Sequence, residues 1–341
     1  MVRISAPGKV HLIGEHAVVY GEPAILAAVG LRMSVEAEKS DSIRVTGSKI
    51  HNDIEWDVQE TKEFAKNIEK LWEESDRTKD FSKLFSRVKG GIFKKAIIGT
   101  ALNEFGIDSG ITLNMQSDIP TSSGLGSSSA VAAIIIKAIA DAYGISALLE
   151  KVNEITYKCE QYVHGNPSGG DNTAVVHGGI VWFERNLDGG ANRIETLQRE
   201  IPHKLHGFVL AYIKRPEKST GELVSMVRET DPSVRDPAIK AIGEAARKMR
   251  SALRERDSEK IKSLINTAWE NLRIFGLSVP EADDLIAKIR ESGGAAKLCG
   301  ACGGGMMLAY HENPETIKNI IKEAGFSPME VELGVEGIRK E

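Results

Sequence analysis

The stretch SSGLGSSSA at residues 122–130 is the part of the sequence that decides the fold. It combines five serines with two glycines, and the apolar run VAAIIIKAIADAYG follows it directly at residues 131–144. The first amides of a helix have no partner within the helix and carry the positive end of its dipole. Glycines let such a backbone approach a ligand closely, and serine hydroxyls can cap the helix, contact phosphate oxygens or reach a magnesium ion. The pattern therefore predicts a nucleotide-phosphate loop at a helix start.

A segment of this kind has a second interpretation, an ordinary serine-capped helix that follows a flexible turn. It lacks the G-x-x-x-x-G-K-[ST] pattern of a Walker-type loop. It also lacks the acidic residue about 20 positions further on that a dinucleotide site prefers. Other motifs must decide between the two interpretations.

Size and charge limit the possible functions. The chain has 341 residues, and single cores stop growing near roughly 250–300 residues, so we expect two domains. Hydrophobic residues make up 41% and charged residues 27%, which is typical of a globular protein. A net charge of −4 gives no electrostatic footprint for nucleic acid or an anionic membrane, so neither is an expected partner.

The cysteines and the first residues indicate the compartment. Cys159, Cys299 and Cys302 are too few for a disulfide framework. The Cys299-x-x-Cys302 spacing suggests zinc or redox chemistry, but without a second cysteine pair we disfavour it. The first ten residues, MVRISAPGKV, lack the long apolar core of a secretory signal or membrane span. We therefore expect a cytoplasmic protein.

Hydrophobic periodicity and turn residues predict the order of the elements. In the first half we expect two strands divided by a Pro-Gly turn at 2–13, a continued strand pattern at 17–38, helices over 60–105 with breaks near 76–80 and 90–91, a strand at 111–120 and a helix from 145 to about 162. A hairpin turn at 186–193 and a strand at 206–213 follow, and then helices over 220–292. The last elements are a strand, a glycine-rich loop and a strand at 295–310, a helix at 312–325 and a final strand at 327–337. The switch between domains is placed near the hairpin turn, giving domains 1–188 and 189–341.

The stretch PGKVHLIGEHAVVYGEP at 7–23 carries several polar residues among valines, leucines and isoleucines. They are Lys9, Glu15, His16 and Tyr20. A charged side chain on a strand whose other residues are apolar costs free energy on burial unless it pairs with another charge or binds a ligand. The stretch is therefore a candidate functional site.

Two further segments carry candidate chemistry. In KCEQYVHGNPSGGDNTAVVHGG at 158–179, Glu160 and His164 are four apart and share a helix face. Asp171 follows in what we expect to be a glycine-rich turn, which is a common way to aim a catalytic carboxylate but is also a common plain turn. The segment AAKLCGACGGGMM at 295–307 predicts a second backbone-lined loop.

Taken together, these motifs resemble those of the GHMP small-molecule kinases. The resemblance rests on APGKVHLIGEHAVVYG, DIPTSSGLGSSSA, HGNPSGGDNT and KLCGACGGG, in this order, and extends from Ala6 to about Met307. It implies an α+β fold of two lobes with a cleft between them. The N-terminal lobe would be like the second domain of ribosomal protein S5, and the C-terminal lobe would be ferredoxin-like.

The resemblance also implies an activity. HLIGEHAVVYG together with HGNPSGGDN is similar to the branch of the family that phosphorylates the 5-hydroxyl of mevalonate with ATP and Mg²⁺, an early step towards isoprenoids. Alternatives are a relative that acts on phosphomevalonate or a sugar, a decarboxylase relative, and a non-catalytic nucleotide or metabolite sensor. A homodimer is a further expectation from the family.

Site residues carried over from the family motifs fall into four groups. Asp171 would be the catalytic carboxylate and Lys9 its cationic neighbour. Glu15, His16, Thr220 and Gly303 would contact mevalonate, and Ser128 and Glu160 would hold magnesium. The triphosphate would lie on the loop formed by Ser123, Gly124, Leu125, Gly126, Ser127, Ser128 and Ser129. A lysine within ~4 Å of Asp171 would interact by roughly 4 kcal/mol at an effective dielectric near 20, enough to depress the carboxyl pKa.

This chain departs from the family pattern in two of the motifs, and the segment ENLRIFGLSVPEADDL at 270–285 matches the family only in part. The third motif usually reads KLTGAGGGG, so Cys299 and Cys302 replace a threonine and a glycine, and we expect the Cys302 side chain to crowd the loop. The serine-rich segment differs from the usual GSGLGSSAA, and we expect no loss from Ser129.

Overall fold

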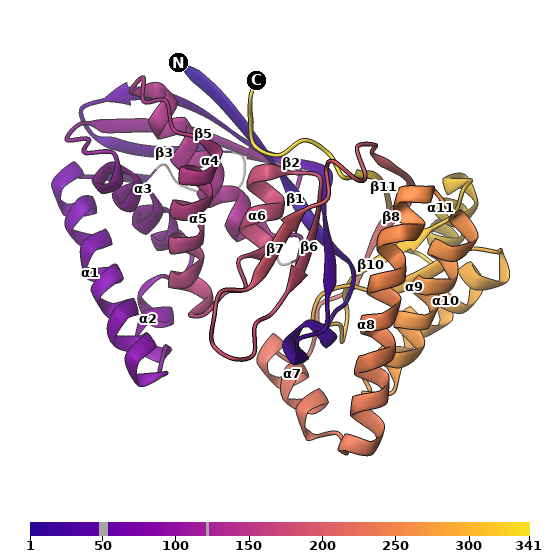
Figure 1. Cartoon of the computed structure of the whole chain (residues 1–341). Coiled ribbons are helices and arrows are strands. Elements are labelled where there is room, and N and C mark those ends of the chain that lie inside the picture. The colour runs from indigo at the N-terminus through magenta and orange to yellow at the C-terminus, as the bar shows by residue number, and fades with distance from the viewer. Residues whose placement is uncertain (48–53, 121–122) are drawn as a thin grey trace.

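The computed structural model describes residues 1–47, 54–120 and 123–341. Figure 1 shows α1–α6 on one side and α7–α11 on the other, with the long strands β1 and β2 between the two groups. Within the described residues the strands form one 12-stranded sheet. None of the helices in these ranges is both long and apolar enough to span a membrane.

The N-terminal part consists of a sheet covered by helices. Its strands are β1 (Val2–Ile13), β2 (Ala24–Ser40), β3 (Ile43–Gly47), β4 (Ile54–Trp56), β5 (Gly110–Ser117) and β6 (Ile180–Glu184). Its helices are the 3₁₀ helix η1 (Ala17–Tyr20), α1 (Val58–Thr78), α2 (Ser82–Arg87), α3 (Ile92–Glu104), α4 (Ser127–Ala142), α5 (Leu149–His164) and α6 (Gly170–His177). Strand β2 is the centre, since β1, β5 and β6 all pair with it antiparallel. The predicted helix breaks near 76–80 and 90–91 are confirmed.

Two expectations for the first 23 residues are wrong. The predicted pair of strands is one strand, β1, which pairs with β2 along its length and shifts register between Pro7 and Gly8. Proline and glycine are tolerated in a strand at such an irregularity, so the Pro-Gly pair makes no turn. Residues 17–20 form η1 rather than a strand, because Gly14 turns the chain at φ +103° directly after β1.

The C-terminal part has a ferredoxin-like order. Its elements are β7 (Arg193–Thr196), β8 (Leu205–Lys214), α7 (Thr220–Glu229), α8 (Pro232–Glu255), α9 (Ser258–Arg273), α10 (Pro280–Glu291), β9 (Ala295–Leu298), β10 (Gly305–Tyr310), α11 (Pro314–Glu323), β11 (Pro328–Leu333) and β12 (Arg339–Lys340). Strands β8, β9, β10 and β11 with their helices follow the β-α-β-β-α-β pattern, and their order in the sheet is β11-β8-β10-β9. The predicted hairpin at 186–193 is confirmed, since β6 and β7 pair antiparallel.

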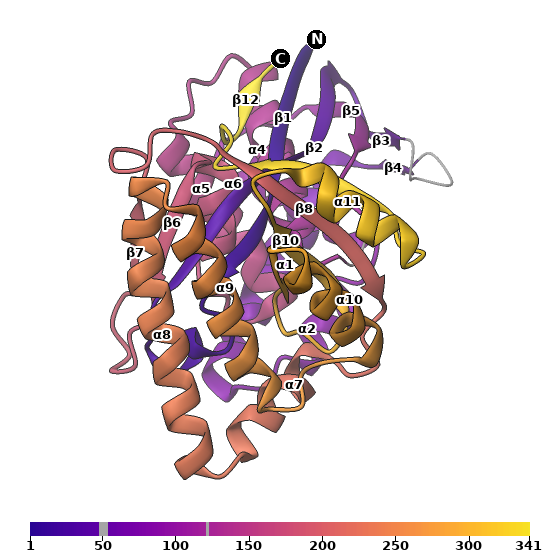
Figure 2. The same cartoon turned by 90° about the vertical axis from the view of Figure 1, so that its right-hand side faces the viewer.

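The chain ends beside its beginning. Strand β12 pairs with β1, with Ile4 opposite Lys340, and Figure 2 shows the two termini side by side. The expected last strand at 327–337 is therefore followed by one more, which is too short to give a pattern in the sequence. The predicted boundary between residues 188 and 189 falls in the loop between β6 and β7, and it stays a prediction because one sheet continues across both parts.

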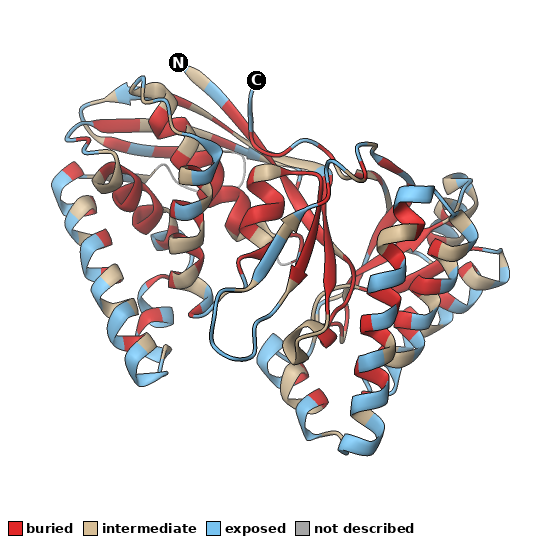
Figure 3. Ribbon diagram, in the orientation of Figure 1, coloured by how far each residue is buried: buried red, intermediate tan, exposed pale blue. Residues whose placement is uncertain are grey.

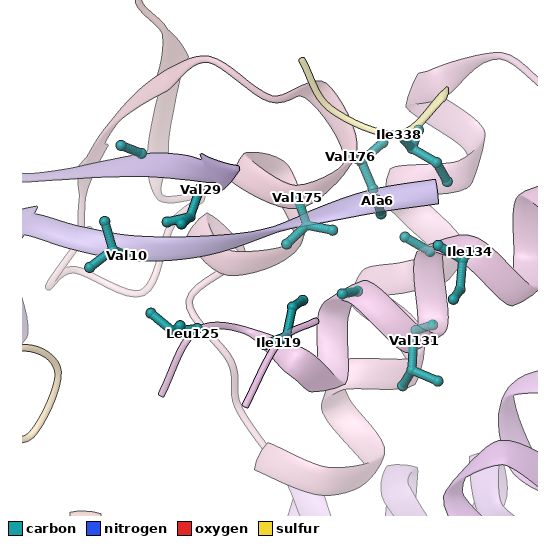
Figure 4. Packing of buried hydrophobic residues seen from close by; sticks show 14 of the residues in the cluster. Ala6, Val10, Val29, Ile119, Leu125, Val131, Ile134, Val175, Val176 and Ile338 are labelled. Carbon is teal, nitrogen blue, oxygen red and sulfur yellow. The ribbon is translucent and has the colours of Figure 1, made fainter. Parts of the chain in front are cut away.

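The main core fixes the start of α4. Most strands and the inner helix faces are buried, while the outer helix faces and β7 are mostly exposed (Figure 3). Val131 and Ile134 of α4 belong to the same buried cluster as Ala6 of β1 and Val175 and Val176 of α6 (Figure 4). Burial of one such side chain contributes about 1.5–3 kcal/mol, so α4, α6 and β1 are held against one another. These three elements carry the first three motifs.

Candidate active site

The four motifs meet at one pocket of about 390 Å³. It is lined by Lys9, His11, Glu15, His16, Val18, Val19, Gly124, Gly126, Ser127, Ser128, His164, Asp171, Thr220, Val224, Gly300 and Ala301. The pocket lies where the start of α4, the end of β1, the start of α6 and the loop after β9 come together. It therefore takes residues from both parts of the chain.

The serine-rich loop lies against β1 and opens the start of α4 to this pocket. The Lys9 amide donates to the Leu125 carbonyl at 2.9 Å. Gly126 is the N-cap of α4 at φ +72°, and a Cβ there would lie 2.7 Å from Cγ of Lys9. Since glycine has no side chain to cap the first amides, they are available for an anion. Thr121 and Ser122 of this motif lie outside the described residues.

Lys9 and Asp171 form an ion pair inside the pocket. The Lys9 ammonium lies 2.9 Å from Oδ2 of Asp171, and the Lys9 side chain is only 6% exposed. Asp171 lies in the first turn of α6, a helix, and not in the glycine-rich turn that the sequence predicts. Burial alone would raise the pKa of Asp171, but Lys9 and His11 outweigh it and hold the pKa below its usual value. The expected depression of this pKa is confirmed.

His11 is a pocket residue that the sequence analysis missed. It follows Lys9 by two positions on β1, so both side chains lie on one face of the strand. Burial, with Lys9 adding to it, lowers the pKa of His11 to about 3, which leaves the imidazole neutral near pH 7. The signal in the sequence was the polar residue at every second position, in KVH.

A second polar cluster joins α4 to α5. The hydroxyls of Ser128 and Ser129 donate to Oε2 of Glu160 at 3.2 and 2.7 Å. Nε2 of His164 lies 3.3 Å from the Ser128 hydroxyl and 3.6 Å from Oε2 of Glu160. Burial raises the pKa of Glu160. Ser129 does not line the pocket, but its hydroxyl holds Glu160, a role that the sequence analysis did not foresee.

The oxygen atoms of this cluster suit a magnesium ion as ligands. Oε1 of Glu160 is buried and has no hydrogen-bond partner among the described residues. A carboxylate oxygen and the Ser128 hydroxyl suit Mg²⁺, which prefers oxygen ligands and keeps several waters. Nowhere in 1–47, 54–120 or 123–341 do three or more His, Cys, Asp or Glu side chains gather in a way that could hold a metal.

Glu15 and His16 also line the pocket. His16 has φ +60°, a left-handed conformation that costs a non-glycine residue on the order of 1–3 kcal/mol, and its Nε2 lies 3.1 Å from the Ala301 carbonyl. Burial lowers the pKa of His16. Glu15 is buried and pairs with Lys297, which is also buried. Lys297 belongs to the third motif but has no predicted role, although a lysine inside the apolar strand AAKL was a signal.

Of the remaining predicted site residues, some line the pocket and others do not. Thr220 begins α7 and lines the pocket. Gly303 lies outside the pocket, its amide donates to the Leu277 carbonyl at 2.8 Å, and its contact with substrate stays a prediction. Ser123 and Leu125 are buried residues of the serine-rich loop, and the Ser123 hydroxyl donates to the Pro120 carbonyl at 2.8 Å.

Cys302 does not crowd the pocket. Its backbone has φ +64°, in the region that favours glycine, and the side chain is buried in an apolar cluster with Leu223 and Leu298. Its Sγ lies 3.8 Å from the Leu298 carbonyl and 3.7 Å from the Gly300 carbonyl. The thiol therefore packs inside the C-terminal part and does not itself line the pocket, although it contacts the carbonyl of Gly300, which does.

Comparison with known families identifies the class of protein. The family model described as "GHMP kinases N terminal domain" matches residues 92–179, and the one described as "GHMP kinases C terminal" matches residues 249–327. The fold and the two matched domains thus define a GHMP kinase.

Whole-chain comparison is more specific. The mevalonate kinase of Thermococcus sibiricus is 32% identical, covering 100% of this chain and 98% of that protein, and the mevalonate kinase of Pyrococcus furiosus is 33% identical, covering 99% and 97%. A crystal structure of mevalonate kinase has a TM-score of 0.80 at 25% identity and covers 98% of this chain and 100% of that one. The Methanococcus jannaschii mevalonate kinase structure shares the fold, with a TM-score of 0.79 at 24% identity and 98% of each chain covered. This chain belongs to the mevalonate kinase family of the GHMP kinases.

Proposed function

We propose that the protein transfers the γ-phosphoryl group of ATP to the 5-hydroxyl of mevalonate, giving ADP and 5-phosphomevalonate for isoprenoid biosynthesis. The observation that carries the proposal is the Lys9–Asp171 ion pair, which lines one pocket together with the start of α4 and the Glu15–His16 pair. Full-length relatives named mevalonate kinase support the choice of acceptor.

The phosphates of ATP would lie at the start of α4. Amides at a helix N-terminus favour negative charge, and Gly124, Gly126, Ser127 and Ser128 line the pocket there. Ser123, Leu125 and Ser129 are buried residues of the same segment and would hold its conformation. The phosphates would then lie close to the ammonium of Lys9.

Asp171 and Lys9 would act on the reacting hydroxyl. A lowered pKa keeps Asp171 ionised near pH 7, so its carboxylate can accept a hydrogen bond from the 5-hydroxyl and orient its oxygen towards the γ-phosphorus. The same low pKa makes Asp171 a weak base, which favours positioning of the hydroxyl over early proton abstraction. Lys9 would stabilise the negative charge that develops on the transferring group.

Ser128 and Glu160 are the residues that would hold Mg²⁺. A bound Mg²⁺ neutralises phosphate charge and helps to align the triphosphate. Support for this proposal is the buried, unpartnered Oε1 of Glu160, whose other carboxylate oxygen lies 3.2 Å from the Ser128 hydroxyl.

Mevalonate would be held by Glu15, His16, Thr220 and Gly303. Of the described residues that line the pocket, Lys9 is the one lysine and none is arginine, and Lys9 is already paired with Asp171. An acceptor that carries a phosphate of its own would need further cationic partners. The lining thus supports mevalonate over phosphomevalonate.

The setting of the enzyme is also a proposal. We propose a cytoplasmic protein with no nucleic-acid or membrane partner, supported by the balanced charge of −4 and the low cysteine content. A homodimer is proposed from the family resemblance alone, and light scattering at working concentration tests it.

An assay of ADP formation with Mg²⁺ tests the proposed function. Mevalonate, 5-phosphomevalonate, galactose and homoserine are offered in turn to the wild type, to Asp171→Ala, and to Asp141→Ala as a matched control. Asp141 lies near the far end of α4, in an ion pair with Lys137. We expect turnover with mevalonate alone, a loss of about 10³-fold or more in Asp171→Ala, and wild-type rates in the control. Turnover of another acceptor in place of mevalonate would overturn the proposal.

A further inference from the structure

Lys297 is a completely buried lysine that has no role in the chemistry described above. Its side chain is 0% exposed and lies on β9 between the buried residues Ala296 and Leu298. Lysine is almost never fully buried unless it is paired, because the charge loses its hydration. Its partners therefore explain why it is there.

The Lys297 ammonium has three donors and three acceptors. It donates to Oε1 of Glu15, to the His11 carbonyl at 3.2 Å and to Sγ of Cys299 at 4.0 Å. Burial raises the pKa of Cys299 to about 11, so the thiol is neutral near pH 7 and Glu15 supplies the negative charge. With all its donors used, the ammonium is held in one position.

Glu15 is only half satisfied by this arrangement. Its side chain is 1% exposed, and while Lys297 binds Oε1, Oε2 is buried without a partner among the described residues. Buried polar atoms are nearly always hydrogen-bonded, so an unpartnered carboxylate oxygen needs an explanation. Glu15 lines the pocket, where a hydroxyl of a bound acceptor would supply the missing donor.

The neighbouring residue is held from the same segment. His16 keeps its left-handed φ of +60° while its Nε2 contacts the carbonyl of Ala301, four positions after Lys297. One segment of the C-terminal part, from β9 into the glycine-rich loop, therefore fixes both consecutive pocket residues of the N-terminal part. A strained backbone or a buried polar group is maintained only where many surrounding contacts hold it in place, and such positions are typical of functional sites.

We propose that Lys297 is a positioning residue for the acceptor alcohol. It fixes the Glu15 carboxylate through Oε1, so that Oε2 is held ready to accept a hydrogen bond from a hydroxyl of the acceptor. The inference rests on the proposed function, because it assigns Glu15 to the acceptor and not to ATP. Lys297 acts through Glu15 and has no contact with the reacting atoms.

Steady-state kinetics of Lys297→Met tests the inference. Methionine keeps an unbranched side chain of similar length and removes the charge. We expect the KM for mevalonate to rise about tenfold or more, the KM for ATP to stay within about threefold, and kcat to fall less than the KM for mevalonate rises. Lys95→Met is the matched control, since Lys95 is another buried lysine in an ion pair, with Glu60, but lies outside the pocket. It should leave both KM values unchanged.

A double-variant cycle separates positioning from stability. If Lys297 acts through Glu15, then Glu15→Gln and Glu15→Gln/Lys297→Met have the same KM for mevalonate within about threefold. This comparison does not use Lys297→Met alone, and the double variant leaves no unpaired buried charge. A further tenfold rise in KM in the Glu15→Gln background, or an equal rise in both KM values in Lys297→Met, would overturn the inference. If the wild-type protein does not turn over mevalonate at all, that result counts against the proposed function and not against the role of Lys297.

Discussion

At the scale of the residue, Asp171 keeps a lowered pKa although burial alone would raise it, because Lys9 lies 2.9 Å away. If Asp171 must be ionised, the rate falls as the pH drops through its pKa. In Lys9→Met, burial still raises the pKa of Asp171 but the main group that lowers it is gone, so this pKa rises. The acid limb of the wild-type kcat profile should lie below the usual carboxyl pKa of 3.8. In Lys9→Met we expect this limb to move up by about one unit or more, into the range between pH 4 and 9, and kcat to fall about 10²-fold or more.

Lys137→Met is the control for this experiment, because Lys137 pairs with Asp141 at 2.5 Å in a different part of α4. Its pH profile should match that of the wild type. An unshifted acid limb in Lys9→Met would mean that Asp171 does not set the rate at low pH.

Burial also decides the behaviour of the thiols. It raises the pKa of Cys159 and Cys302 far above the usual range and that of Cys299 to about 11. Thiolates are the reactive form, so we expect the native protein at pH 8 to react with a thiol reagent at least about 100-fold more slowly than the unfolded protein. Ellman's reagent with and without denaturant measures this. Rapid modification of one thiol in the native protein would contradict the expectation and would point to a redox-sensitive Cys299-x-x-Cys302 pair.

At the scale of the element, the start of α4 depends on Gly126. Alanine at φ +72° costs about 1–2 kcal/mol, and its Cβ would meet Cγ of Lys9 at 2.7 Å. We therefore expect Gly126→Ala to lower the free energy of unfolding by about 1–3 kcal/mol and to raise the KM for ATP about tenfold. Denaturant unfolding and steady-state kinetics measure the two effects.

Gly144→Ala separates backbone strain from the site. Gly144 lies at φ +75° just after α4, and a Cβ added there would have nothing within 4 Å, so the strain is similar and the collision is absent. We expect a similar strain cost and unchanged kinetics. Equal KM values for ATP in the two variants would show that the close approach of the loop to Lys9 is not needed for ATP binding.

Sequence patterns predicted the helices and the hairpin better than they predicted the irregular elements. The runs after Gly126 and over 60–105 have the length and periodicity of helices, and they form α1 to α4. The Pro7-Gly8 pair is typical of a turn, but its pairing with the distant β2 makes it a bulge in one strand. The segment GNPSGGDN is rich in turn residues and so predicts a turn at Asp171, whereas packing of Val175 and Val176 in the core favours the helix α6.

At the scale of the whole molecule, the site depends on contacts between residues far apart in the sequence. The motifs could be found along the chain because each has a local pattern of glycine, serine or charge. The pairing of Lys297 with Glu15 spans 282 positions and has no local pattern, so only the folded chain reveals it. His11 could be matched to Lys9 from strand alternation, but its neutral state depends on burial in the assembled pocket.

The two parts of the chain are also joined by Arg250 of α8. Its guanidinium donates to Oε1 of Glu195 at 2.8 Å, also contacts Glu200, and lies 5.3 Å from the centre of the Trp182 ring. Glu195 lies on β7 and Trp182 on β6, so this one side chain links α8 to the β6–β7 hairpin. A network of charges around a partly buried arginine contributes more than an isolated surface pair.

Arg250→Met should therefore lower the free energy of unfolding by about 1–3 kcal/mol, measured by urea denaturation. Arg254→Met is the matched control, since Arg254 lies one turn further along α8 and pairs only with its neighbour Glu255 among the ion pairs of the described residues. Its effect should stay within about 0.5 kcal/mol, and 1 M salt should reduce the difference between the two variants because it screens the charges. Equal stabilities of the two variants at low salt would mean that the sheet and the apolar core, and not this network, hold α8 in place.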